Sequence, residues 1–149
     1  MTAFLCASLL TITLCFQLMA QDHTNNPPAA AKLPTTICDW NNMPVTQLTN
    51  GVRRAVFDGP TTSVDNLYCH ITTLNPGQTS GEPRLHLHEE VIIIKEGTIE
   101  ADWDGHTQTV GAGSVIFFAA HAVTRLRNVG TVPATYTVVY YFTPLTPKG

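Results

Sequence analysis

The chain has 149 residues, which is enough for one domain and hardly enough for two. Apolar residues make up 44% of the sequence and charged residues 13%, a balance that suits a packed globular domain and argues against intrinsic disorder. The formal net charge is −3, and the eight lysines and arginines are scattered along the chain. The charge pattern therefore excludes a basic nucleic-acid-binding surface as the expected role.

The first twenty residues, MTAFLCASLLTITLCFQLMA, form an apolar stretch without a charged side chain. The stretch is interrupted by Thr, Ser and Gln and is short for a membrane span. It predicts a signal peptide over residues 1–20, cleaved near Ala20, and an exported protein, periplasmic or extracellular, with no membrane span after cleavage. An uncleaved membrane anchor is the alternative reading.

Two cysteines, Cys38 and Cys69, remain in the mature chain. In an exported protein they can form one disulfide, and the alternative is a pair of buried free thiols. The sequence favours neither, because it does not show how far apart the two α-carbons lie.

The next segment, QDHTNNPPAAAKLPTT at residues 21–36, is rich in Pro, Asn, Ala and Thr and lacks apolar periodicity. It predicts a linker. The domain is expected over residues 37–143, followed by a short tail at residues 144–149.

Within the domain, β-prone runs recur between turn signals, without helical periodicity between them. An Asp-Gly pair at Asp104 and Gly105 separates two of these runs and predicts a hairpin. Strands at this spacing indicate an all-β sandwich or barrel. The runs are NLYCHITTL (66–74), VIIIKEGTIEADW (91–103), HTQTV (106–110), SVIFFAA (114–120) and TYTVVYYF (135–142).

Two spacings in this region match motifs of a known family. Glu90 is followed after six residues by Gly97 and preceded by His86, and a second motif fits at its outer positions, Gly113 and Asn128. In these motifs the sequence resembles a small single-domain cupin. The resemblance covers roughly residues 66–141 and implies a jelly-roll β-barrel. It also implies a homodimer, since cupins often dimerise.

The resemblance further implies a divalent metal, which cupins hold with three histidines and a glutamate. Two of these four positions are occupied here by ligands, His86 and Glu90. The other two hold Arg84, in place of the first histidine, and Thr124, in place of the histidine of the second motif. The fold motifs are therefore matched, whereas the metal motifs are degenerate.

Two further histidines are candidates to replace the lost ligands. Residues 84, 86, 88 and 90 share one face if the strand is continuous, so His88 would lie beside His86. His121 lies three residues before Thr124, in a turn that can reach the mouth of the barrel. The candidate set is His86, His88, Glu90 and His121, whose nitrogen and oxygen donors suit Fe, Mn, Zn, Ni or Cu.

Arg84 argues against a metal, because a guanidinium stays protonated and repels a dication. If no metal binds, Arg84 is expected to pair with Glu90 inside the barrel. Arg84 and Thr124 are also the candidate substrate-binding residues, since a fixed guanidinium suits a carboxylate or another anion.

Three functions follow from these alternatives, and the first two have a small molecule as the partner. The first is a metal-dependent enzyme, an oxidoreductase such as a dioxygenase, or an isomerase. The second is a metal-free module that binds an anion with Arg84. The third is a structural barrel whose site has decayed. The fold does not choose among them, and no residue is assigned a catalytic role.

Overall fold

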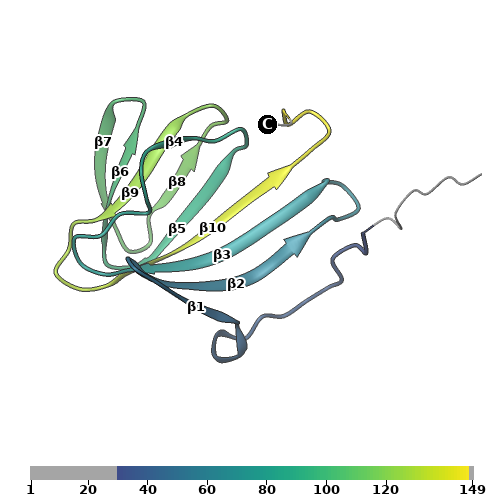
Figure 1. The fold of residues 1–149 in the computed structure, drawn as a ribbon, viewed down its shortest axis with the longest axis horizontal. Helices are drawn as coiled ribbons and strands as arrows, with labels where there is room; N and C mark the ends of the chain where they lie inside the picture. Colours follow the sequence, from purple (N-terminus) through teal and green to yellow (C-terminus); the bar gives the residue numbers. More distant parts are fainter. Residues whose placement is uncertain (1–29, 148–149) are drawn as a thin grey trace, which may run out of the picture.

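The computed structural model describes residues 30–147, which contain ten β-strands and one short 3-10 helix (Figure 1). The sequence-based expectation of an all-β protein is confirmed. The elements are η1 (Trp40–Asn42), β1 (Val45–Leu48), β2 (Gly51–Gly59), β3 (Asn66–Leu74), β4 (Arg84–Leu85), β5 (Glu90–Glu96), β6 (Thr98–Trp103), β7 (His106–Gly111), β8 (Val115–Phe118), β9 (Val123–Asn128) and β10 (Ala134–Phe142).

Two antiparallel sheets form the jelly roll. The larger sheet has the order β1-β2-β3-β10-β5-β8, and the smaller sheet has the order β4-β9-β6-β7. Figure 1 shows the last strand, β10, in yellow between β3 and β5. Because β10 pairs with both neighbours along most of its length, the end of the chain joins its early and middle parts into one sheet.

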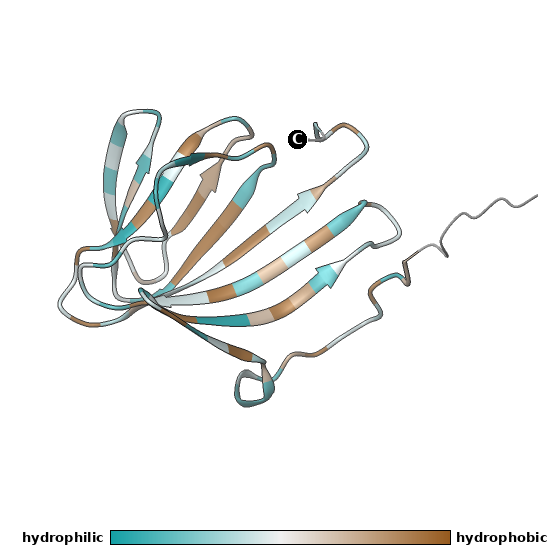
Figure 2. Cartoon of the chain, in the orientation of Figure 1, coloured by the Kyte–Doolittle hydropathy of each residue, from teal (hydrophilic) through white to brown (hydrophobic). Residues whose placement is uncertain are grey.

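Strand alternation supplies the core between the two sheets. Apolar side chains of both sheets are buried there, and Figure 2 shows apolar and polar bands alternating along the long strands. On β10 the residues with even numbers face inward, and Tyr136 and Val138 are fully or nearly buried. The buried set is Leu74, Ile92, Ile94, Ile99, Ala101, Phe118, Leu126, Ala134, Tyr136 and Val138.

The predicted hairpin at Asp104 and Gly105 is confirmed. These two residues connect β6 to β7, with Trp103 paired to His106 across the turn. Both have positive φ angles, 45° and 83°, as the common two-residue hairpin turn requires. The Asp104 carboxylate also accepts a hydrogen bond of 2.9 Å from the backbone amide of Val123, which fixes the turn against β9.

Gly97 occupies a position that no other residue would fill without rearrangement. It has a φ of 84° in the turn between β5 and β6, and a β-carbon there would lie 2.5 Å from the Cα and Cβ atoms of Ala134. The glycine of the first motif is therefore needed for the close approach of this turn to β10.

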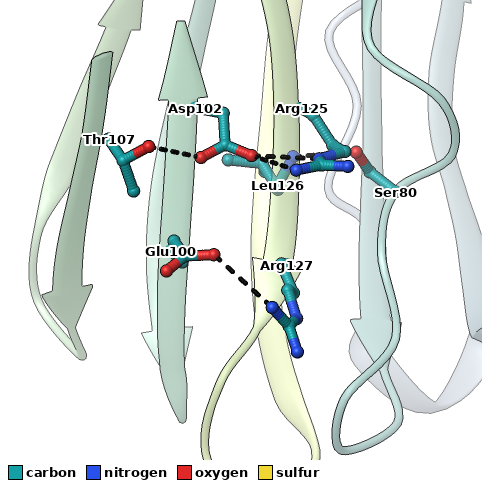
Figure 3. A network of polar contacts seen from close by, with 7 residues as sticks. All are labelled: Ser80, Glu100, Asp102, Thr107, Arg125, Leu126 and Arg127. Atoms are coloured by element: carbon teal, nitrogen blue, oxygen red, sulfur yellow. Dashed lines mark hydrogen bonds and ion pairs between the residues drawn. The ribbon is translucent and has the colours of Figure 1, made fainter. Parts of the chain in front are cut away.

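The outward face of the smaller sheet carries cross-strand ion pairs (Figure 3). Leu126 points into the core, and its neighbours Arg125 and Arg127 point outward, as alternation predicts. Arg125 donates to Asp102 at 2.6 and 3.0 Å, and Arg127 lies 3.9 Å from Glu100. Burial opposes ionisation of Asp102, but the hydrogen bonds and charges of its partners outweigh burial and lower the pKa of the carboxyl.

The segment that precedes β1 lies against the outward face of the larger sheet. Leu33 donates a backbone hydrogen bond of 2.8 Å to Pro60. The Trp40 ring lies 4.2 Å from the Arg54 guanidinium of β2 and 3.6 Å from the Lys95 ammonium of β5. Two cations on strands far apart in the sequence thus hold one aromatic ring, and the part of the predicted linker at residues 30–36 contacts the domain.

Cys38 and Cys69 are free thiols in the structure. Cys38 donates from Sγ to the Val56 carbonyl at 3.6 Å, and Cys69 is buried in β3. Burial, together with the nearby Cys38, raises the pKa of Cys69 to about 11, so its thiol is protonated at neutral pH.

The buried side chain of Asn128 joins three parts of the fold. Its Nδ2 group donates to the carbonyl groups of Leu74 at 3.0 Å and Val132 at 2.8 Å, and its Oδ1 atom accepts from the amide of Gly130 at 2.9 Å. The asparagine of the second motif therefore ties the end of β3 to the loop between β9 and β10.

Replacing Asn128 by alanine should lower the free energy of unfolding by about 3 kcal/mol, because several buried backbone groups lose their partners. Urea denaturation followed by circular dichroism measures the change. Asn75→Ala, at an exposed position, is the matched control and should change stability by less than about 0.5 kcal/mol. Equal losses in the two variants would contradict this role for Asn128.

Candidate functional site

Two imidazoles and one carboxylate converge at the start of β5. His86 Nδ1 and His88 Nε2 each lie 3.4 Å from the same Glu90 oxygen, Oε1. One ligand atom from each residue lies within 4.8 Å of the others, and the three side chains are largely shielded from solvent. We call His86, His88 and Glu90 the triad.

A bend, rather than a continuous strand, brings the triad together. The expectation that residues 84–90 form one strand is wrong, because β4 ends at Leu85 and β5 begins at Glu90. In a continuous strand the Cα atoms of residues 86 and 90 would lie about 13 Å apart, at roughly 3.3 Å per residue. That distance is too large for side chains projecting in parallel to meet, so the bend at residues 86–89 is what makes the cluster.

Backbone hydrogen bonds to the turn between β8 and β9 hold this bend. The amide of His86 donates to the carbonyl of Ala122 at 3.2 Å, and the amide of His121 donates to the carbonyl of His86 at 2.7 Å. His121 has a φ of 69°, an uncommon value for a residue other than glycine. Its side chain is exposed and is not part of the triad. The structure therefore places the backbone of His121, but not its imidazole, at the site.

Aromatic rings fix the orientation of His88. Its ring stacks on Tyr140 with 4.1 Å between centroids and meets the edge of Phe142 at 4.9 Å. Tyr140 stacks in turn on Tyr68 at 4.6 Å. Because the rings lie side by side on β3 and β10, the imidazole of His88 is held by packing as well as by the bend.

The donors of the triad suit a metal ion. Burial lowers the pKa of His86, with Arg84 and His88 acting in the same direction and Glu90 opposing them. The neutral imidazole is the form that binds metals. Among the described residues, the buried Nε2 atom of His88 has no hydrogen-bond partner, since its approach to Glu90 lacks hydrogen-bond geometry. An ion bonded at about 2.1 Å spans ligands up to roughly 4.2 Å apart, which accommodates the 3.4 Å from Glu90 to each histidine.

Arg84 and Thr124 lie opposite each other, paired between β4 and β9. Thr124 is 5% exposed and lines the cavity above the core, whereas Arg84 is exposed. The expected ion pair between Arg84 and Glu90 is not formed: within residues 30–147, the basic side chains that approach Glu90 are the imidazoles of His86 and His88. Arg84 is exposed to solvent and still lines the space that contains the triad.

Two neighbouring spaces with shared lining residues reach the triad. An inner cavity of about 120 Å³ reaches the core residues Ile92, Tyr136 and Val138. An outer groove of about 370 Å³ opens past His88, Tyr140 and Phe142, within the roughly 300–1,000 Å³ typical of small-molecule sites. Both spaces are lined by Arg53, His70, Arg84, His86 and Glu90.

Sequence reasoning missed two of these shared residues, Arg53 and His70. His70 lies on the inner face of β3 beside Tyr68, with 5.4 Å between ring centroids. Burial and the charges of Arg53 and Arg84 lower the pKa of His70 to about 4. Alternation along NLYCHITTL would have placed Tyr68, His70 and Thr72 on one face, and this was the available signal.

Comparison with known proteins agrees with this geometry. The family model Cupin_2, described as a cupin domain, matches residues 70–140. This match and the jelly-roll fold support a small cupin-type domain, with His86 and Glu90 of the triad at positions of the first cupin motif and His88 two residues beyond His86.

Individual relatives lie at low sequence identity. The protein named polyketide synthase CurC from Streptomyces cyaneus is 25% identical over 117 residues, which cover 78% of this chain and 75% of that protein. An RmlC-like cupin from Shewanella frigidimarina NCIMB 400 has a TM-score of 0.61 at 15% identity, covering 75% of this chain and 95% of that chain. The polyketide cyclase RemF from Streptomyces resistomycificus has a TM-score of 0.61 at 16% identity, covering 72% and 80%. These two structures show the fold that they share with this chain.

Substitutions at His121 distinguish the role of its backbone from the role of its imidazole. His121→Gly and His121→Ala should both keep any metal bound by the wild-type protein, because the imidazole lies outside the triad. His121→Gly should also be at least as stable as His121→Ala, since a β-carbon disfavours this left-handed conformation by roughly 1 kcal/mol. Elemental analysis and thermal unfolding measure the two effects. Loss of metal in both variants would restore His121 as a ligand.

Proposed function

We propose that this cupin domain holds one divalent metal ion with His86, His88 and Glu90 and binds a small molecule in the pocket beside it. The observation that carries the proposal is the convergence of the three donors within 4.8 Å, with the buried Nε2 atom of His88 lacking a partner among the described residues. A buried polar atom without a partner is costly, and a metal ion would supply one.

The donor set favours a particular class of chemistry. Two histidines and one carboxylate, with positions left open for other ligands, are typical of non-haem iron(II) oxygenases. We therefore propose iron(II) as the ion and an oxidoreductase of the dioxygenase type as the activity. An ion of this kind binds an oxygen ligand and polarises it. An isomerase that uses only this polarisation is the second candidate.

The chain itself has defined tasks in such a site. Glu90 offsets part of the charge of the ion, and the stacked ring of Tyr140 keeps His88 in one orientation. The aromatic and aliphatic walls of the outer groove exclude water from one side of a bound molecule. The names of two relatives, a polyketide synthase and a polyketide cyclase, support a ligand rich in carbonyl and enol oxygens.

We also propose that the protein is exported. The support is the charge-free apolar stretch at residues 1–20, which lies outside the described residues. Within residues 30–147, no helix is long and apolar enough to cross a membrane.

Metal content tests the proposed site directly. Protein purified without chelator or affinity metal should contain close to one equivalent of a divalent transition metal, measured by inductively coupled plasma mass spectrometry. Loss of a residue that only hydrogen-bonds to a metal ligand typically weakens metal binding 10- to 100-fold, and loss of a ligand itself should weaken it at least as much. The variants His88→Ala and Glu90→Gln should therefore be nearly metal-free.

Each of these variants has a matched control in the chain. His106→Ala removes an exposed imidazole, and Glu89→Gln makes the same change one residue away from Glu90. Both controls should retain the wild-type metal content. Wild-type protein that takes up no divalent metal, or variants that bind it as well as the controls, would refute the metal site.

Export is tested at the N-terminus of the protein from its native host. Cleavage of the apolar stretch should give a mature chain that starts close to Gln21, because the small residue Ala20 suits a cleavage site. Mass spectrometry of the N-terminal peptide measures this. An intact Met1 on protein recovered from the cytoplasm would show that the stretch is not an export signal.

A further inference from the structure

We propose that Arg53 and Arg84 form a carboxylate-binding subsite at the mouth of the pocket, so that the ligand is a small oxo or hydroxy acid. This inference rests on the proposed function only in taking the pocket as the ligand site. It does not require that the triad holds a metal.

Strand register places Arg53 on the face that lines the pocket. Arg53 of β2 pairs with Thr72 of β3, which pairs with Tyr136 of β10. Two rows along the same face, Tyr68 pairs with Tyr140, which pairs with Glu90. Since directly paired residues project to the same side of a sheet, Arg53 and Glu90 share the inner face. Arg54 projects to the opposite face, where it contacts Trp40.

Positive charge is in excess in the outer groove. Its lining contains two guanidinium groups, from Arg53 and Arg84, and one carboxylate, from Glu90, which gives 2 − 1 = +1. His70 adds no charge at neutral pH, because its imidazole is held neutral by burial and by the two arginines. The positive and negative charges that line the inner cavity are closer to balance, since Glu82 also lines it and Arg125 is paired with Asp102. An anion therefore fits the outer groove best.

The two arginines keep donors free for such an anion. Arg53 donates from Nη2 to the Tyr68 hydroxyl at 2.8 Å, which holds the side chain in place and leaves its other N–H groups without a partner among the described residues. Arg84 makes no side-chain hydrogen bond or ion pair within residues 30–147. A guanidinium has five donors, and its planar fork matches the two oxygens of a carboxylate.

The triad, in the same groove, determines what the rest of the ligand carries. The arginines and the triad line the same groove of about 370 Å³, so one small molecule can contact both. A carboxylate at the arginines then leaves a neighbouring keto, enol or hydroxyl oxygen facing His86, His88 and Glu90. An oxo or hydroxy acid has both groups a few bonds apart.

Titration of metal-free protein with 2,4-dioxopentanoate, followed by isothermal titration calorimetry, tests the subsite without involving the metal. The full chain is treated with chelator beforehand. Arg53→Gln and Arg84→Gln should each weaken binding by about tenfold or more, because each removes charged hydrogen bonds to the carboxylate. The methyl ester of the probe, which lacks the charge, should bind wild-type protein at least tenfold more weakly than the acid.

Arg54→Gln is the matched control, since it removes the same charge from the adjacent residue on the other face of the sheet. It should bind the probe as the wild type does. Circular dichroism and the unfolding midpoint check the fold of each variant, and Arg84 at its exposed position gives a second variant should Arg53→Gln unfold. Equal affinities for acid and ester, or wild-type affinity in folded Arg53→Gln and Arg84→Gln, would overturn the subsite. Arginine-dependent binding in a protein that takes up no metal would sustain the subsite while refuting the metal site.

Discussion

Two backbone hydrogen bonds between His86 and the turn at residues 119–122 determine where the side chains of the triad lie. They interrupt the strand that the sequence pattern suggests, and only a bent chain can bring His86 and Glu90 within 3.4 Å. The loop between β8 and β9 itself requires His121 in a left-handed backbone conformation, and it requires the start of β9 to be in place. Packing of His88 on Tyr140 then completes the arrangement, so the site needs β4, β5, β9 and β10 to be in place together. Tertiary pairing, rather than local sequence, makes this cluster.

The fold was accessible from the sequence because it rests on short-range signals. Alternating apolar residues, the Asp104–Gly105 turn and the spacing from Glu90 to Gly97 each depend on a few neighbouring residues, and the structure contains all three. Strand pairing was not accessible in the same way. That β10 lies between β3 and β5 depends on pairs separated by 60 to 76 residues with β3 and by 39 to 50 residues with β5, which no local pattern encodes.

The site was accessible only in part, for the same reason. His86, His88 and Glu90 are close in sequence, and a family motif marks two of them, so these three were named correctly as neighbours. The reason given for their proximity, a continuous strand, was wrong. Arg53 lies 31 residues before Arg84 and was not considered, because only the pairing of β2 with β3 and of β3 with β10 brings it to the pocket. His121 was named for its imidazole, whereas its backbone is the part that contacts the site.

In the sequence, Arg84 stands at a position where cupins have a metal-binding histidine, and its positive charge would repel a metal ion. The electrostatics of the pocket bear on this conflict. A guanidinium beside metal ligands is unfavourable when the two positive charges face each other across a low-dielectric space. Arg84 lies at the exposed mouth, however, and Glu90 lies with the histidines, so carboxylate and guanidinium are separated rather than paired. An anionic ligand placed between Arg84 and the triad would screen Arg84 from a dication at the triad. Both positive charges would attract it. If the triad holds a dication, as proposed, the arginine that replaces a ligand in the motif would place one positive charge at the entrance of the pocket, where it would favour an anionic ligand.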